Sequence, residues 1–167
     1  MALDHAQVPK TIPRPVDDGL ASHLLGSTIP ADLSLVSTQG TSVRLAELPG
    51  LTILFCYPRT GAPERHYRDN FPLLTELGAN AVFGLSVQDS AYQQEAKERL
   101  GLPYDLLSDE KLEFVKAMKM PVFEWEGKPL TKRITLALRD GKVEHVWYPV
   151  FPPDENSAQV AAWLGAQ

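Results

Sequence analysis

Apolar runs alternate with charged segments through the middle of the chain, and this alternation predicts an α/β fold. Residues 51–57 and 81–87 are almost continuously apolar, which is expected of central strands covered on both faces. Between these runs, apolar residues recur at helical spacing from 67 to 77. Pro72 falls inside this helix, so we expect either a kink or two shorter helices. Strand, helix and strand with short connections predict a parallel, right-handed crossover.

Two glycine turns between alternating segments predict antiparallel hairpins. Gln39-Gly40 lies between the halves of residues 33–45, and Asp140-Gly141 lies between the halves of residues 130–150. In the second hairpin we expect Arg133 to begin the strand. A short strand is also expected over residues 104–107.

Capping residues predict where further helices begin. Either Asp89 or Ser90 is expected to cap the helix after the second central strand, and Ser90 and Gln93 have the spacing of a capping box. Asp154 or Asn156 should cap the last helix. A shorter helix is expected in between, over about residues 109–118. The residues expected to face inward are Tyr92, Ala96 and Leu100 in the first of these helices and Leu112, Val115 and Met118 in the shorter one. The last helix carries the apolar residues Val160, Trp163 and Leu164.

This order of elements predicts one thioredoxin-like α/β domain, with a mixed central sheet, helices on both faces and a closing antiparallel hairpin. A length of 167 residues with 44% hydrophobic content suits one well-buried core. Pro9, Pro13 and Pro15 exclude a helix or a central strand from the start of the chain. We therefore expect an extended proline-rich arm over residues 1–22 and a single domain over residues 23–167.

Charge and composition set further expectations. The net charge is -5 and the 16 Lys and Arg residues are scattered, so neither nucleic acid nor an anionic membrane is an expected partner. The sequence has no basic start followed by an apolar run and no stretch as long as a membrane span, which suggests a cytoplasmic protein. A single cysteine excludes an internal disulfide and agrees with a reducing compartment.

The candidate reactive side chains are few. Cys56 lies inside the first central strand, where apolar burial raises the pKa of a thiol, so we interpret it as structural. His66 lies near a helix start without an identifiable nucleophile or carboxylate partner, and we expect it to be solvated. The four histidines share no ligand spacing, and no phosphate-binding glycine motif is present. We expect no metal and no cofactor.

Several blocks of the sequence are distinctive when taken together. They are Phe-Cys-Tyr-Pro-Arg-Thr-Gly-Ala-Pro, Tyr-Arg-Asp-Asn-Phe, Val-Phe-Gly-Leu-Ser-Val-Gln-Asp, Leu-Pro-Tyr-Asp-Leu-Leu-Ser-Asp and the closing segment 132–153. These blocks resemble the peroxiredoxins, in particular their Q-type (bacterioferritin-comigratory, AhpC/TSA-like) branch. The resemblance covers most of the chain from Leu33 onward. It implies an antioxidant oxidoreductase that reduces hydroperoxides to water or alcohols, is restored by a thioredoxin-like reductant, and is a monomer or weak dimer.

Peroxiredoxins use a cysteine thiolate in a P-x-x-x-T-x-x-C motif, and the resemblance assigns only part of that site to this chain. Pro58 looks like the motif proline, and Arg133 looks like the arginine that stabilises the thiolate. From its pattern alone, Arg133 is equally well a surface residue at a strand end. Thr60 is near the turn, but it cannot be placed at the motif threonine, because the spacing that would define that position is absent. The peroxidatic cysteine has no counterpart before Tyr67.

Two explanations stay open at this point. If the chain truly lacks the cysteine loop, it is a thioredoxin-fold binding or assembly module, with the exposed turn and Arg133 as its recognition surface. If instead a segment is missing from the sequence between Pro58 and Tyr67, the protein is a peroxide reductase. An intact mass of 18.5 kDa would favour the first explanation, and a heavier species with extra thiols would favour the second.

Overall fold

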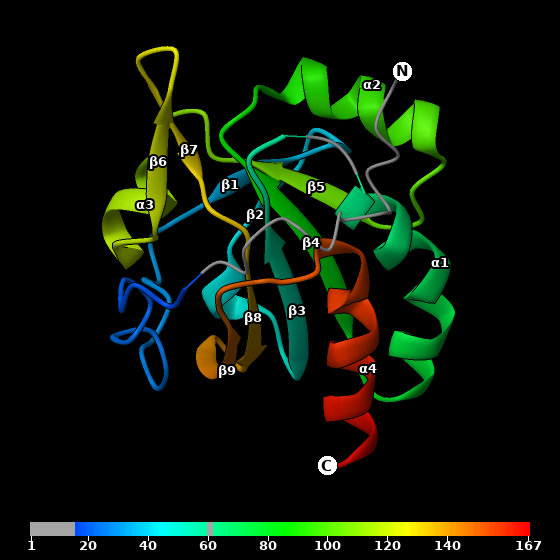
Figure 1. Cartoon of the computed structure of the whole chain (residues 1–167). Coiled ribbons are helices and arrows are strands. Elements are labelled where there is room, and N and C mark those ends of the chain that lie inside the picture. Colours follow the sequence, from blue (N-terminus) through cyan, green and yellow to red (C-terminus); the bar gives the residue numbers. More distant parts are fainter. Residues whose placement is uncertain (1–15, 60–61) are drawn as a thin grey trace.

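The computed structural model describes residues 16–59 and 62–167 (Figure 1). Its strands are β1 (Leu35–Ser37), β2 (Ser42–Val43), β3 (Leu51–Cys56), β4 (Ala81–Ser86), β5 (Asp105–Ser108), β6 (Val122–Trp125), β7 (Lys128–Thr131), β8 (Ile134–Arg139) and β9 (Lys142–Trp147). Its helices are α1 (Ala62–Glu76), α2 (Ser90–Leu100), α3 (Glu113–Met118) and α4 (Asn156–Gly165), with 3₁₀ turns η1 (Leu45–Glu47) and η2 (Pro153–Glu155).

The main sheet has seven strands in the order β2-β1-β5-β4-β3-β8-β9, and β6 and β7 form a separate two-stranded sheet. The neighbouring strands β3, β4 and β5 are parallel to one another. On the two sides of this unit, β1 pairs with β5 and β8 pairs with β3, both antiparallel. The predicted crossover and both predicted hairpins, β1 with β2 and β8 with β9, are confirmed. The architecture is a thioredoxin-like α/β fold, as expected.

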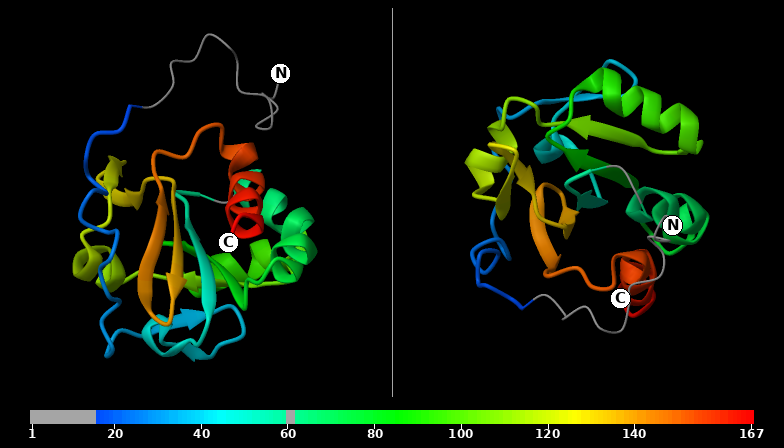
Figure 2. Two further views of the ribbon diagram at one scale, coloured as in Figure 1. Left: turned by 90° about the horizontal axis from the view of Figure 1, so that it is seen from below. Right: turned by 45° about the horizontal axis from the view of Figure 1, so that its top comes forward.

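Each face of the sheet has its own apolar core. Helices α1 and α4 pack side by side over one face, where Ile53, Phe55 and Leu106 are buried (Figure 2). Helix α3 and the segment before β1 cover the other face, where Leu54 and Leu85 are buried. All six residues of β3 are buried, because this strand lies inside the sheet and is covered on both faces.

Helix α2 begins as one of the two alternatives predicted, but its inward face differs from the prediction. The Asp89 carboxylate caps it by accepting a hydrogen bond from Tyr92 N at 2.8 Å. Gln93 does not complete a capping box with Ser90; it is fully buried and donates to Leu107 O at 2.8 Å and Ser86 Oγ at 3.0 Å. Because Gln93 faces β5, Tyr92 is turned outward and is 44% exposed, so the expectation that Tyr92 faces inward is wrong.

The other helix boundaries also depend on tertiary contacts. Helix α3 begins at Glu113 rather than near residue 109, because the Asp109 carboxylate accepts hydrogen bonds from Phe114 N at 3.0 Å and Val115 N at 2.9 Å. Helix α4 has no side-chain cap, so neither Asp154 nor Asn156 has the predicted capping role. Helix α1 continues through Pro72 as one element, which excludes the alternative of two shorter helices.

The hairpin of β6 and β7 was not expected from the sequence. Its strands have four residues each, one of them contains Pro129, and they meet at Glu126 and Gly127, both with positive φ. Strands this short give too few alternations for a period to be detected. After β7 ends at Thr131, the chain turns over residues 132–133. Strand β8 therefore begins at Ile134, one residue after the predicted start at Arg133.

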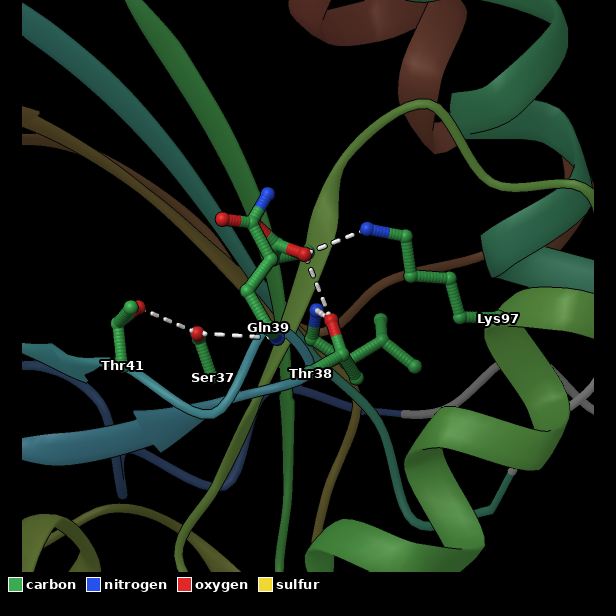
Figure 3. Close-up of polar contacts among 7 residues, drawn as sticks. Ser37, Thr38, Gln39, Thr41 and Lys97 are labelled. Atoms are coloured by element: carbon green, nitrogen blue, oxygen red, sulfur yellow. Dashed lines mark hydrogen bonds and ion pairs between the residues drawn. The ribbon is translucent and has the colours of Figure 1, made fainter.

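A polar cluster joins the turn between β1 and β2 to β5 and α2 (Figure 3). Thr38 Oγ1 donates to Asp105 Oδ1 at 2.7 Å, and Lys97 Nζ donates to the same oxygen at 2.5 Å. Thr38 Oγ1 also accepts a hydrogen bond from Leu106 N at 3.2 Å. These bonds fix the edge of the sheet opposite β9.

Most of the predicted arm, residues 1–15, lies outside the described residues, and the boundary at residue 22 stays a prediction. The described part of the arm contributes Ala21 to the core that also contains Leu24. Among the described residues, no helix combines the length and the apolar character that a membrane crossing requires.

Candidate functional site

Pro58 and Arg133, the two residues assigned by resemblance, lie together. Pro58 follows the carboxyl end of β3, and Arg133 precedes β8, whose Ile134 is the register partner of Cys56. Both residues line a pocket of about 210 Å³. Thr60, the third motif residue considered, lies outside the described residues.

The walls of this pocket, which we call the Arg133 pocket, combine apolar and charged side chains. Asp18 accepts hydrogen bonds from Lys132 Nζ at 2.9 Å and from Tyr148 OH at 2.9 and 3.0 Å. The hydrogen bond from Lys132 outweighs partial desolvation and lowers the pKa of Asp18 to about 2. Desolvation and the nearby Asp18 charge raise the pKa of Tyr148, which keeps it a protonated donor. The remaining walls are apolar and include Phe123 and Val150.

Arg133 is the cation that the pocket leaves available. Among the described residues its side chain makes no hydrogen bond or ion pair, whereas the charge of neighbouring Lys132 is paired with Asp18. Arg133 is an exposed residue. Partial desolvation of its side chain lowers its pKa, and the negative charge of Glu64 raises it by a smaller amount. A guanidinium stays protonated under such opposing effects and offers a planar set of N–H donors to an anion.

Cys56 is not positioned to act with Arg133. Its side chain is 3% exposed and packs in the core with Leu85 and Ile134. Because side chains alternate along β8, Arg133 points to the opposite face from Ile134. Burial, with a smaller contribution from the Asp109 charge, raises the pKa of the Cys56 thiol far above its ordinary value.

The space between Cys56 and Arg133 is too small for a substrate. A cavity of about 10 Å³ touches both residues. That volume is near the minimum for a single water molecule, so a hydroperoxide does not fit. In this arrangement the thiol is neutral, buried and inaccessible.

A buried hydrogen-bond junction lies beside this cavity. Asn156 Oδ1 accepts from Tyr67 OH at 2.5 Å and from Thr135 Oγ1 at 2.6 Å. Burial raises the pKa of Tyr67, so its hydroxyl stays a donor. The junction ties α1, β8 and α4 together next to Arg133. Sequence reasoning missed it, because an asparagine at a helix start is the usual sign of a cap.

The remaining sequence candidate, His66, lies on α1 and is half-buried. Glu64, which the sequence did not single out, is fully buried in the first turn of α1. Its backbone oxygen accepts a hydrogen bond from Tyr104 OH at 2.6 Å, and its charge affects Arg133. Within the described ranges, no group of His, Cys, Asp and Glu side chains could hold a metal ion. No local sequence signal pointed to Asp18 or Tyr148 as part of a site.

Relatives of the chain were identified by sequence. The chain matches the model of the Redoxin family over residues 24–162. It is 35% identical over 102 residues to Peroxiredoxin bcp1 of Schizosaccharomyces pombe, an alignment that covers 56% of this chain and 51% of that protein. It is 25% identical over 162 residues to the chloroplastic Peroxiredoxin Q of Suaeda salsa, covering 93% of this chain and 75% of that protein. The chain thus spans about half the length of the first of these relatives.

Solved structures agree with this relationship. Peroxidoxin BcpB from Mycobacterium tuberculosis superposes with a TM-score of 0.75 at 28% identity, covering 86% of this chain and 98% of that one. Peroxiredoxin Q of Xanthomonas campestris, at 22% identity, shares the fold with a TM-score of 0.74 over 87% of this chain and 97% of that one. The family model covers most of the chain, and the relatives are of the type recognised from the sequence blocks. The chain therefore belongs to the Redoxin family, in its Q-type peroxiredoxin branch.

Proposed function

We propose that this chain is a redoxin-fold binding protein that does not reduce peroxides through a thiol of its own. The observation that supports this most directly is the position of its single cysteine, which is 3% exposed inside β3. A peroxidatic sulfur has to be ionised and accessible, and burial of Cys56 opposes both requirements.

The binding site in this proposal is the Arg133 pocket. Arg133 supplies guanidinium N–H donors and feels the charge of Glu64, whereas the adjacent charge of Lys132 is paired with Asp18. Phe123, Val150 and Pro58 supply apolar walls, and the volume of about 210 Å³ fits a small molecule. These features favour a small monoanion with a short apolar tail, such as a short-chain carboxylate.

The alternative function is thiol-dependent reduction of hydroperoxides with a thioredoxin-like reductant. It is favoured by the names of the relatives, which are peroxiredoxins, and by the proximity of Pro58 and Arg133. It requires either that Cys56 leave its strand or that the protein contain a further cysteine. The intact mass separates these cases, because the chain described here has a mass of 18.5 kDa.

A peroxidase assay tests the proposal. Protein with a mass of 18.5 kDa should consume hydrogen peroxide or cumene hydroperoxide no faster than its Cys56→Ala variant, with thioredoxin, thioredoxin reductase and NADPH present. Alanine is preferred to serine in this control, because serine would place an unpaired hydroxyl in the apolar core. An active peroxiredoxin verifies the coupling enzymes. Turnover that disappears in Cys56→Ala would refute the proposal.

A binding measurement tests the proposed site. Arg133→Met should weaken the affinity for butyrate by about tenfold, because it removes a charge-assisted hydrogen bond while keeping a side chain of similar length. Butyrate titrations followed by NMR chemical shifts give the dissociation constants. The matched control is Arg139→Met at the other end of β8, where Arg139 Nε pairs with Glu144 Oε2 at 3.0 Å. Equal affinities for both variants would exclude Arg133 as the binding group.

A further inference from the structure

A larger cleft lies at the carboxyl ends of the three parallel strands. It has a volume of about 620 Å³ and is bordered by the residues that follow β3, β4 and β5, with β7 opposite them. Of the residues described, it shares only Pro58 with the Arg133 pocket. Its position and volume are typical of ligand sites in α/β proteins.

The two cations of this cleft lie on neighbouring segments and form one wall that can face an anion. The guanidinium carbon of Arg59 lies 5.2 Å from the ring centroid of Trp125, and Trp125 is the cross-strand partner of Lys128. Neither the Arg59 nor the Lys128 side chain forms an ion pair or a hydrogen bond within the described part of the chain. Of the two acidic residues that line the cleft, Asp89 already accepts the capping hydrogen bond of α2. Both carboxylates keep their charge, but they lie on the segments after β4 and β5, whereas the two cations lie on the segment after β3 and on β7.

The cleft also has apolar surface that a simple inorganic anion would leave in water. Val87, Leu112 and Leu130 line it and are half-buried. The side chain of Tyr92, 44% exposed, lines it as well, and Trp125, 48% exposed, holds its ring against Arg59. Exposed aromatic side chains beside a concave surface are characteristic of binding sites.

From this combination we infer that the cleft binds an amphipathic carboxylate, with a planar apolar body against Tyr92 and Leu112 and its carboxylate toward Arg59 and Lys128. This inference goes beyond the proposed function, because it concerns different side chains and a larger ligand. The volume of about 620 Å³ accommodates a two-ring body. The cationic wall requires the anionic group, so the neutral amide of the same ligand should bind poorly.

The experiment compares 2-naphthoate with 2-naphthamide by isothermal titration calorimetry. We expect naphthoate to bind at one site and naphthamide to bind at least about tenfold more weakly, since a charge-assisted hydrogen bond is lost. Arg59→Met and Lys128→Met should each weaken naphthoate binding by about tenfold. Lys116→Met, on the exposed side of α3, is the matched control and should leave the affinity unchanged. Circular dichroism melting curves verify that each variant is folded.

The Arg133→Met variant separates this inference from the proposed function. It should leave naphthoate binding unchanged, because Arg133 does not line the cleft. If Arg133→Met alone abolished naphthoate binding, the ligand would occupy the Arg133 pocket, and the inference would be wrong while the proposed function stood. Equal affinities for naphthoate and naphthamide, or no binding at millimolar concentration, would also overturn it.

Discussion

Replacing Asn156 by alanine should lower the free energy of unfolding by about 2–4 kcal/mol, because it leaves two buried hydroxyl groups without their acceptor. Asn156 is 2% exposed, and its Oδ1 accepts hydrogen bonds from Tyr67 OH at 2.5 Å and Thr135 Oγ1 at 2.6 Å. The three residues belong to α1, β8 and α4, so one substitution loosens three elements at once. Urea unfolding followed by circular dichroism measures the change.

A neighbouring residue provides the control for Asn156→Ala. Gln159 is exposed and accepts a weak hydrogen bond from Asn156 Nδ2 at 3.3 Å, so Gln159→Ala should change the free energy of unfolding by less than about 0.5 kcal/mol. If the two variants were equally stable, the junction would not contribute the stability assigned to it.

Asn156→Asp adds a pH-dependent comparison, because the carboxylate keeps an acceptor oxygen but brings a charge into the core. Burial raises the pKa of such an aspartate in the folded state above its unfolded value of about 3.9. The folded state then binds the proton more tightly, so stability is lost as the pH rises above that unfolded pKa. The variant should approach the wild type below about pH 4 and fall below it at neutral pH.

Asn156 and Gln93 show where sequence reasoning about helices reached its limit. Both are polar residues in the first turn of a helix, where local capping rules predict that they cap the helix or complete a capping box. In the folded chain each is buried and bonds to other elements, Gln93 to β4 and β5, Asn156 to α1 and β8. Local sequence predicts that a polar residue lies at a helix start, but tertiary packing decides which groups form hydrogen bonds with its side chain.

The central strands and the site differ in how far the sequence predicts them. The apolar runs of β3 and β4 are nearly continuous in sequence, so the position of these strands, and the burial of Cys56, follow from local pattern. The Arg133 pocket is built from contacts such as that of Asp18 with Tyr148, which are 130 residues apart. Pro58 and Arg133 were found only through resemblance to a family, because no periodicity marks them.

Replacing Phe55 by alanine should have the largest effect of all, about 3–5 kcal/mol in the free energy of unfolding. Phe55 is 2% exposed on β3, stacks on Tyr67 of α1 with ring centroids 4.2 Å apart, and meets the ring of Tyr104 edge-on at 5.6 Å. The Phe55 ring packs directly on the backbone of Gly84 in β4, where a Cβ would lie only 2.8 Å from Phe55 Cζ. Because Gly84 has no side chain, it cannot fill the cavity that alanine would leave.

Two comparisons make this prediction specific to the aromatic stack. Leu73→Ala removes a comparable apolar side chain that is 44% exposed on the same helix as Tyr67, and should cost less than about 1 kcal/mol. In a double-mutant cycle, Phe55→Ala with Tyr67→Leu should cost less than the sum of the single variants, by about 0.5–1.5 kcal/mol for the lost ring contact. If the two effects were additive, the packing of α1 on β3 would rest on general apolar burial, and the stacked rings would contribute nothing beyond their area.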